Sequence, residues 1–135
     1  MSVTRNGAPV RLVAQMRPQA PRVLLIGPVS HVREGLAAAL RAAGMSPVLA
    51  DDMLGAAVAV ARAPAALAIV TAEVSHAAQF IARLRASPAF LDTPIIALST
   101  SPAQAASARA AGADAAHEGP LTARDVAALA KAALR

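Results

Sequence analysis

The hydrophobic positions of this chain form a repeating pattern of short apolar runs and longer amphipathic stretches. Short apolar runs are typical of strands that are buried on both faces of a sheet. Four of them occupy residues 23–26, 47–50, 67–70 and 94–98, and a weaker run of small residues covers 113–117. Each run is followed by apolar residues at helical spacing. The pattern predicts five strand–helix cycles, that is, a parallel sheet covered by helices on both faces.

Residues that start or stop helices stand between these runs. Hydroxyl and carboxylate side chains are common at helix N-termini, where they accept hydrogen bonds from the first turn, and glycine is common just past the C-terminus. The expected N-caps are Asp51 or Asp52, Ser75, Ser101 and Thr122, the last in a capping box with Asp125, and the expected stops are Gly44 and Gly112.

The helical spacing also predicts which side chains face the core. We expect the inward positions to be Val29, Val32, Leu36 and Leu40 in the first helix, Leu54, Val58 and Ala61 in the second, Phe80, Ile81 and Leu84 in the third, and Val126, Leu129 and Ala133 in the last.

Charge divides the chain into two parts. Residues 1–22 carry four arginines and no acid, whereas residues 23–135 carry nine basic and eight acidic side chains. We predict that residues 1–21 form an extended basic leader, in which 10–16 is a weak candidate for an edge strand, and that residues 22–135 form one folded domain. A nearly neutral domain with 1% aromatic residues is a poor nucleic-acid binder, so binding through the leader is the weakest alternative.

Composition excludes several other classes of protein. The chain has 135 residues, which suffices for one domain, and its 56% hydrophobic content is too high for disorder. It has no cysteine, which excludes disulfides, cysteine-bound zinc and thiol catalysis. We found no membrane span, no signal peptide and no motif for phosphate binding or nucleophilic catalysis. We therefore expect a cytoplasmic protein that is not an enzyme and has no cofactor.

Three phrases and their order resemble a bacterial response-regulator receiver domain. They are VLLIGPVSHVREGLAAAL at 23–40, TPIIALST at 93–100 and AGADAAHEGPLTARDVAAL at 111–129. The resemblance covers residues 22–135. It implies a flavodoxin-like (βα)5 fold, a doubly wound parallel sheet with strand order 2-1-3-4-5.

The resemblance also assigns the positions at which receivers phosphorylate themselves. Receivers transfer a phosphoryl group to an aspartate after the third strand, with Mg²⁺ held by an acidic pair after the first strand and a lysine near the fifth. Here the acidic pair falls on Gly27 and Pro28, the phosphoacceptor on Thr71 and the lysine on Gly119, while the hydroxyl that ends the fourth strand is kept as Ser99. The resemblance therefore implies a degenerate receiver, or pseudo-receiver, that keeps the scaffold and lacks the switch.

Two functions follow from this interpretation. The first is a phosphorylation-independent protein–protein interaction module in bacterial signal transduction, whose partner is another signalling protein or a second copy of the chain. In receivers the usual contact face is formed by the fourth helix, fifth strand and fifth helix; here it includes Gln104, Ala108, Ala116 (the position of the receiver's switch aromatic), Leu121 and Leu134. The alternative is a receiver-like effector that binds a nucleotide or cyclic dinucleotide with the leader arginines.

Three histidines are weak candidates for a metal site. His31, His76 and His117 are placed near the carboxyl edge of the sheet, where Glu73 and Glu118 would be neighbours. Because their spacing matches no metal motif, we favour ordinary loop histidines. Glu73 is also a candidate mimic of a phosphoaspartate, although it stands two residues beyond Thr71.

Arginines on the predicted helices allow two readings. Arg83, Arg85 and Arg109 could contact the phosphates of a cyclic dinucleotide. No clustered arginine motif accompanies them, so we favour a solvated helix face.

Overall fold

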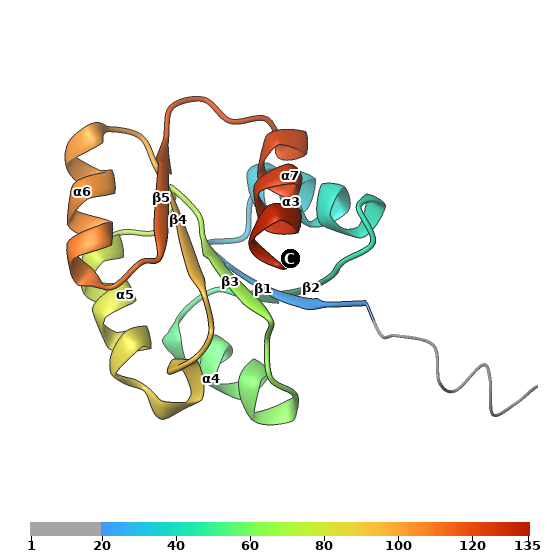
Figure 1. The fold of residues 1–135 in the computed structure, drawn as a ribbon, viewed down its shortest axis with the longest axis horizontal. Coiled ribbons are helices and arrows are strands. Elements are labelled where there is room, and N and C mark those ends of the chain that lie inside the picture. Colours follow the sequence, from blue (N-terminus) through green and yellow to red (C-terminus); the bar gives the residue numbers. More distant parts are fainter. Residues whose placement is uncertain (1–19) are drawn as a thin grey trace, which may run out of the picture.

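The computed structural model describes residues 20–135, which form a five-stranded parallel sheet with helices on both faces (Figure 1). The strand order β2-β1-β3-β4-β5 confirms the predicted doubly wound fold. The candidate edge strand at 10–16 lies outside the described residues, as does nearly all of the predicted leader. The strands are β1 (Arg22–Ile26), β2 (Ser46–Ala50), β3 (Leu67–Val70), β4 (Ile95–Ser99) and β5 (Ala115–Glu118).

Residues 20–135 also form five α-helices and one short 3-10 helix, which lie between successive strands except for the last helix, which follows β5. The helices are α3 (His31–Ala42), α4 (Met53–Arg62), α5 (Ala77–Ala86), η1 (Pro88–Phe90), α6 (Pro102–Ala111) and α7 (Ala123–Ala133). None of the helices in residues 20–135 is long and apolar enough to cross a lipid bilayer.

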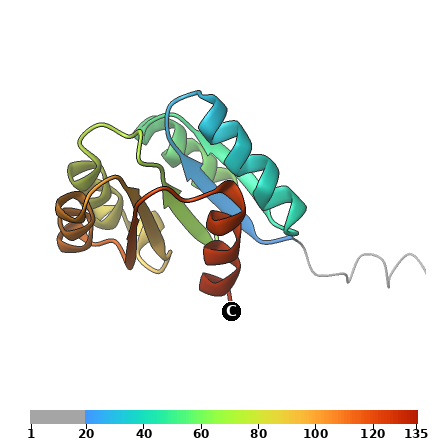
Figure 2. The ribbon, with the colours of Figure 1, turned by 90° about the horizontal axis from the view of Figure 1, so that it is seen from above.

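Two hydrophobic clusters hold the layers together, one on each face of the sheet. Side chains alternate between the faces along a strand, so Leu24 and Ile26 join the cluster under α4, α5 and α6, whereas Val23 and Leu25 join the cluster under α3 and α7. The two helical layers are visible from the side and from above (Figures 1 and 2).

The register of the central strands brings together the loops that follow β1, β2 and β3. Ile26, the last residue of β1, pairs with Ala50 of β2 and with Val70 of β3. The loops that follow β1, β2 and β3 therefore leave the sheet at one level, at its carboxyl edge.

The inward face predicted for α4 is wrong. Leu54 is 74% exposed and Val58 46% exposed, and Ala61 is exposed as well. The helix instead buries Ala56 in the cluster, with Met53 and Val60 packed beside it. Asp52 caps the helix by accepting a hydrogen bond from the Gly55 amide (2.8 Å). The position at which the helix begins determines which of its residues face the sheet. Because α4 is apolar on every side, periodicity could not identify its buried face.

Parts of three other helix predictions are also corrected. Val29 precedes the helix that Ser30 caps, and both Val29 (72% exposed) and Val32 (55%) face solvent, whereas Leu36 and Leu40 are buried as predicted. The N-cap position of α5 is held by His76 rather than by Ser75, but the His76 side chain makes no capping hydrogen bond, and its backbone lies in the left-handed region with φ 53°. In α7 Val126 is buried, but Ala133 is exposed.

The other terminal signals are confirmed. Ser101 caps α6 directly before Pro102, and Gly112 ends it. Thr122 and Asp125 form the expected capping box at the start of α7.

Candidate functional site

The positions that the resemblance assigned to phosphorylation lie at the carboxyl edge of the sheet. Gly27 and Pro28 follow β1, Thr71 follows β3, Ser99 is the last residue of β4 and Gly119 follows β5. They therefore share one edge, where ligands bind in folds of this type.

The first feature of this edge is a close contact between Gly27 and Thr71. Thr71 is 1% exposed, and its amide donates to the Ile26 carbonyl (3.0 Å). A Cβ atom added to Gly27 would lie 2.3 Å from Thr71 Oγ1, far inside van der Waals contact. The Thr71 side chain therefore fills the space that any side chain at position 27 would need. Its Oγ1 is buried and has no hydrogen-bond partner among the described residues.

The second feature is a buried cation that the sequence analysis missed. Arg33, on the first turn of α3, is 6% exposed. Its Nη1 donates to the Gly27 carbonyl (3.1 Å) and forms an ion pair with the Asp51 carboxylate. A fixed positive charge therefore lies beneath the loop in which a receiver holds its metal ion.

A sequence signal for Arg33 did exist. Position 33 precedes Leu36, Ala37 and Leu40 by three, four and seven residues, so all four side chains share one helix face. An arginine on an inward face needs an acidic or carbonyl partner. Asp51, directly after the neighbouring strand β2, supplies the carboxylate.

A hydrogen bond ties the β3–α5 loop to α3. Ser30 Oγ accepts from the Arg33 amide (3.1 Å) and donates to Glu73 Oε1 (2.7 Å). The hydroxyl thus caps α3 and also fixes the Glu73 carboxylate at the exposed mouth of the site. Glu73 lies beside the N-terminus of α3 and not in the place of Thr71.

These residues do not fit the magnesium ion that receivers use. Mg²⁺ takes six oxygen ligands in strict geometry, usually with one or two carboxylates. Gly27 and Pro28 have no carboxylate, the Gly27 carbonyl already accepts from Arg33, and Asp51 is paired with the same guanidinium. No step of a metal-dependent reaction can therefore be assigned to this edge.

The structure also places the three histidines. His31 begins α3, His76 directly precedes α5, and both are exposed, whereas His117 lies in β5 and is partly buried. Within residues 20–135 no group of three or more histidine, aspartate and glutamate side chains is arranged to hold a metal ion.

A hollow of about 300 Å³ lies between the β3–α5 and β4–α6 loops. Its lining includes His76, Ser99, Gln104 and Ser107, and no arginine or lysine. Ser99 is 6% exposed. Gly119 has φ +93°, in the region that disfavours residues with a side chain. A lysine at this position would therefore strain the backbone.

The preference for a solvated helix face is wrong for Arg85. Its guanidinium donates to the carbonyls of Gly112 (3.1 Å), Phe90 (3.0 Å) and Thr93 (3.1 Å) and to Asp114 Oδ2 (2.6 Å). Arg109 donates to the Ala116 carbonyl (2.7 Å). The Arg85 guanidinium is therefore engaged within the fold and is not free to bind phosphates, whereas Arg109 makes one hydrogen bond to β5 and stays exposed on α6.

The predicted contact face needs revision. Ala108 and Ala116 are 2% and 3% exposed and belong to the core cluster on the α6 side of the sheet. Leu121 and Leu134 are partly buried and pack against the opposite cluster. Of the five named side chains only Gln104 is fully exposed, and its Oε1 accepts from Thr100 Oγ1 (2.6 Å). The two alanines and the two leucines therefore contribute mainly to the packing of the fold and little to the exposed surface.

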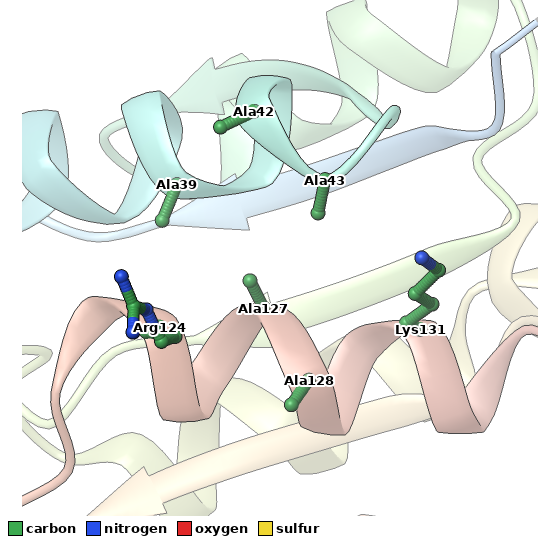
Figure 3. Close-up of a pocket in the computed structure, with 7 residues that line it drawn as sticks. All are labelled: Ala39, Ala42, Ala43, Arg124, Ala127, Ala128 and Lys131. Carbon is green, nitrogen blue, oxygen red and sulfur yellow. The ribbon is translucent and has the colours of Figure 1, made fainter.

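A second surface depression runs between α3 and α7 (Figure 3). It measures about 440 Å³ and is lined by five alanines, with Arg124 at one end and Lys131 at the other. The depression is shallow and cationic at both ends. Its lining residues are Ala39, Ala42, Ala43, Arg124, Ala127, Ala128 and Lys131.

Comparisons with solved structures place this chain among response regulators. A response regulator protein from Burkholderia multivorans is 31% identical, with a TM-score of 0.61, over 84% of this chain and 94% of that one. HP1043, an orphan response regulator of H. pylori, is 19% identical with a TM-score of 0.74, over 88% of this chain and 100% of that one. No family model matches the chain, and no curated protein does.

A third neighbour is an atypical orphan response regulator protein whose structure revealed a new phosphorylation-independent regulatory mechanism. It is 20% identical with a TM-score of 0.70, over 84% of this chain and 95% of that one. At this identity the match concerns the fold.

Proposed function

We infer the function from one premise, that this chain belongs to the response-regulator family. We propose that it is a pseudo-receiver, a receiver domain that acts without phosphorylation. Its role in this proposal is that of a protein–protein interaction module in bacterial signal transduction. The phosphorylation-independent mechanism of one structural neighbour supports the proposal by analogy.

The observation that carries the proposal is the closed crevice at the end of β1. Phosphoryl transfer needs an ionised nucleophile and a cation that neutralises the transferred group. Thr71 is 1% exposed and its hydroxyl is un-ionised at neutral pH. Its Oγ1 has no hydrogen-bond partner among the described residues, so no carboxylate is positioned to act as its base. Arg33 supplies a cation, but its guanidinium is engaged by the Gly27 carbonyl and by Asp51.

A fixed arginine has a consequence for signalling. In a phosphorylated switch the charge at the site changes and a mobile element responds. Here the positive charge belongs to a side chain of α3, and Arg33 Nη1 is held by the Gly27 carbonyl and by Asp51. The proposal is therefore that the crevice does not switch between two charge states. A domain that does not switch can transmit a signal only by binding a partner, and this is what an interaction module does.

For the partner surface we propose the outer side of α6 and the adjoining parts of β5 and α7. Gln104, Ser107 and Arg109 are exposed on α6, and Ala108 and Ala116 support this surface from below. The proposal keeps the face expected from the family and replaces its two buried members by their exposed neighbours.

The direct test is treatment with acetyl phosphate and Mg²⁺, followed by intact-mass measurement. The full chain is expected to gain no phosphoryl group, whereas a receiver with an aspartate after its third strand, treated in parallel, gains one. A stoichiometric gain that mild hydroxylamine removes would reveal an acyl phosphate and overturn the proposal. Glu73→Gln would then show whether Glu73 is the acceptor.

A further inference from the structure

Helix α4 is apolar on all sides although it lies at the surface. Residues 53–61 include no charged or hydrogen-bonding side chain. One side of the helix packs on the sheet, where Ala56 is buried. The opposite side exposes Leu54 (74%) and Val58 (46%), with Ala57 and Ala61 also exposed. These four side chains, here called the α4 stripe, recur at i, i+3, i+4 and i+7, the spacing of a helix–helix contact.

The surroundings of the α4 stripe extend the apolar surface. A groove of about 640 Å³ runs between α4 and β2, and its lining includes Leu54 and Val58 of the stripe together with Val48 and Leu49 of the strand. β2 is an edge strand of the described sheet, and Pro47 removes one of its backbone donors. The edge is therefore poorly suited to accept another strand. A helix fits this surface better.

Charges at the two ends of α4 determine which helix fits. Asp52 precedes the first turn and Arg62 ends the last, about 15 Å apart along the axis. In an antiparallel pair related by a two-fold axis near Ala57, each Asp52 lies beside the partner's Arg62. The same arrangement sets Leu54 against the partner's Ala61, so that large side chains meet small ones.

The leader is a less suitable occupant on grounds of charge. Its residues include Arg5, Arg11 and Arg17 and no acid, whereas the groove is lined by two arginines, Arg22 and Arg62, and one acid, Asp52. Like charges would meet in that arrangement. A second copy instead brings its Asp52 to Arg62.

We propose that this chain self-associates through the α4 stripe as an antiparallel, two-fold symmetric pair. The surface is separate from the crevice and from the α6 face, so the inference goes beyond the proposed function. A contact made by one helix of ten residues and a strand edge is at the small end of specific interfaces. The dimer is therefore in concentration-dependent equilibrium with the monomer.

Sedimentation velocity of the full chain over a range of concentrations tests the association. The sedimentation coefficient is expected to rise with concentration, and Leu54→Glu or Val58→Glu is expected to raise the dissociation constant at least about tenfold. Val32→Glu, on an exposed valine of α3 (55%), is the matched control and should leave it unchanged. All three variants should melt near the parent temperature because their side chains are exposed.

Cysteine cross-linking tests the antiparallel register, because the chain has no cysteine of its own. Ala57→Cys should form a disulfide-linked dimer. Ala61→Cys alone should not, since its partner copy lies about 11 Å further along the axis. A mixture of Leu54→Cys and Ala61→Cys chains should give the mixed dimer.

Three results would overturn the proposal. One is a chain that stays monomeric at all concentrations. Another is equal cross-linking of Ala57→Cys and Ala61→Cys, which excludes this register. The third is a full chain that is monomeric while a variant lacking residues 1–19 dimerises, which would make the leader the occupant. None of these results affects the phosphodonor experiment, so the two proposals fail separately.

Discussion

Arg33 and Asp51 form an ion pair whose two members differ sharply in exposure. The Arg33 side chain is 7% exposed and the Asp51 side chain 61% exposed. A carboxylate that loses its partner here is solvated by water, whereas a guanidinium that loses its partner stays buried with one carbonyl acceptor. Loss of Asp51 should therefore lower the free energy of unfolding more than loss of Arg33 does.

We predict that Asp51→Ala destabilises the fold more than Arg33→Met does. The first change leaves a buried, poorly compensated cation and should cost about 2–4 kcal/mol, whereas the second removes the cation and leaves an exposed anion, at about 1–2 kcal/mol. Urea denaturation of both variants and of the double variant measures this difference. Equal losses, or a larger loss for Arg33→Met, would contradict the burial argument.

The contact between Gly27 and Thr71 predicts a strong coupling between these positions. Gly27→Ala places a methyl group against Thr71 Oγ1 and should lower the free energy of unfolding by about 1–3 kcal/mol. Thr71→Ala removes the hydroxyl and opens space, so the double variant should recover part of the loss. Gly35→Ala is the control, since nothing lies within 4 Å of its added Cβ. Additive losses at positions 27 and 71 would show that the backbone relaxes instead.

Arg85 is predicted to be a structural residue, unlike its neighbour two positions earlier. Arg85→Met removes donors from three carbonyls and from Asp114, and should cost about 2–4 kcal/mol. Arg83 is exposed and has no hydrogen-bond partner among the described residues, so Arg83→Met should change stability by less than about 0.5 kcal/mol. Thermal denaturation of the two variants shows whether the stability depends on the hydrogen bonds of Arg85 or on the presence of any arginine in α5.

The capping box of α7 predicts a dependence of stability on acid pH. The Thr122 amide donates to Asp125 Oδ2 (3.0 Å), and this bond, with further help from the Thr122 hydroxyl and from Arg124, lowers the pKa of Asp125 below 3.8. The stabilisation is complete above the unfolded pKa and is lost as the pH falls through the lowered folded value.

Asp125→Asn should therefore remove part of the stability loss seen between neutral pH and about pH 3. Asp92→Asn, at an exposed aspartate with no hydrogen-bond partner among the described residues, is the matched control for the removal of one exposed carboxylate. An NMR titration that places Asp125 at or above its ordinary pKa would contradict the prediction.

The sequence predicted the fold because local signals and strand order agreed. The runs at 23–26 and 67–70 became β1 and β3 within one residue, and Thr122 with Asp125 began α7 as expected. Such elements are determined by nearest neighbours along the chain. Helix α4 failed because its apolar residues surround the axis, and only the cap at Asp52 and the packing on β2 decide which side is buried.

For the candidate site, the sequence predicted which receiver side chains are missing but not which contacts take their place. Sequence position was enough to predict that Gly27 and Thr71 stand where a receiver has acids. That Thr71 packs against Gly27, and that Arg33 occupies the crevice with Asp51, depends on side chains 18 to 44 residues apart in sequence. Contacts between distant segments are set by tertiary packing and leave little trace in a single sequence.

The packing at the end of β1 also has an evolutionary consequence. An aspartate restored at position 27 collides with Thr71, and a lysine restored at position 119 takes a backbone conformation that only glycine adopts without strain. Each reversal alone therefore weakens the protein, and none alone restores phosphoryl transfer, because the catalytic parts act together. For the pseudo-receiver proposed above, single substitutions of this kind lead only to weaker and still inactive proteins, so a phosphorylation switch could be gained only by several substitutions made together.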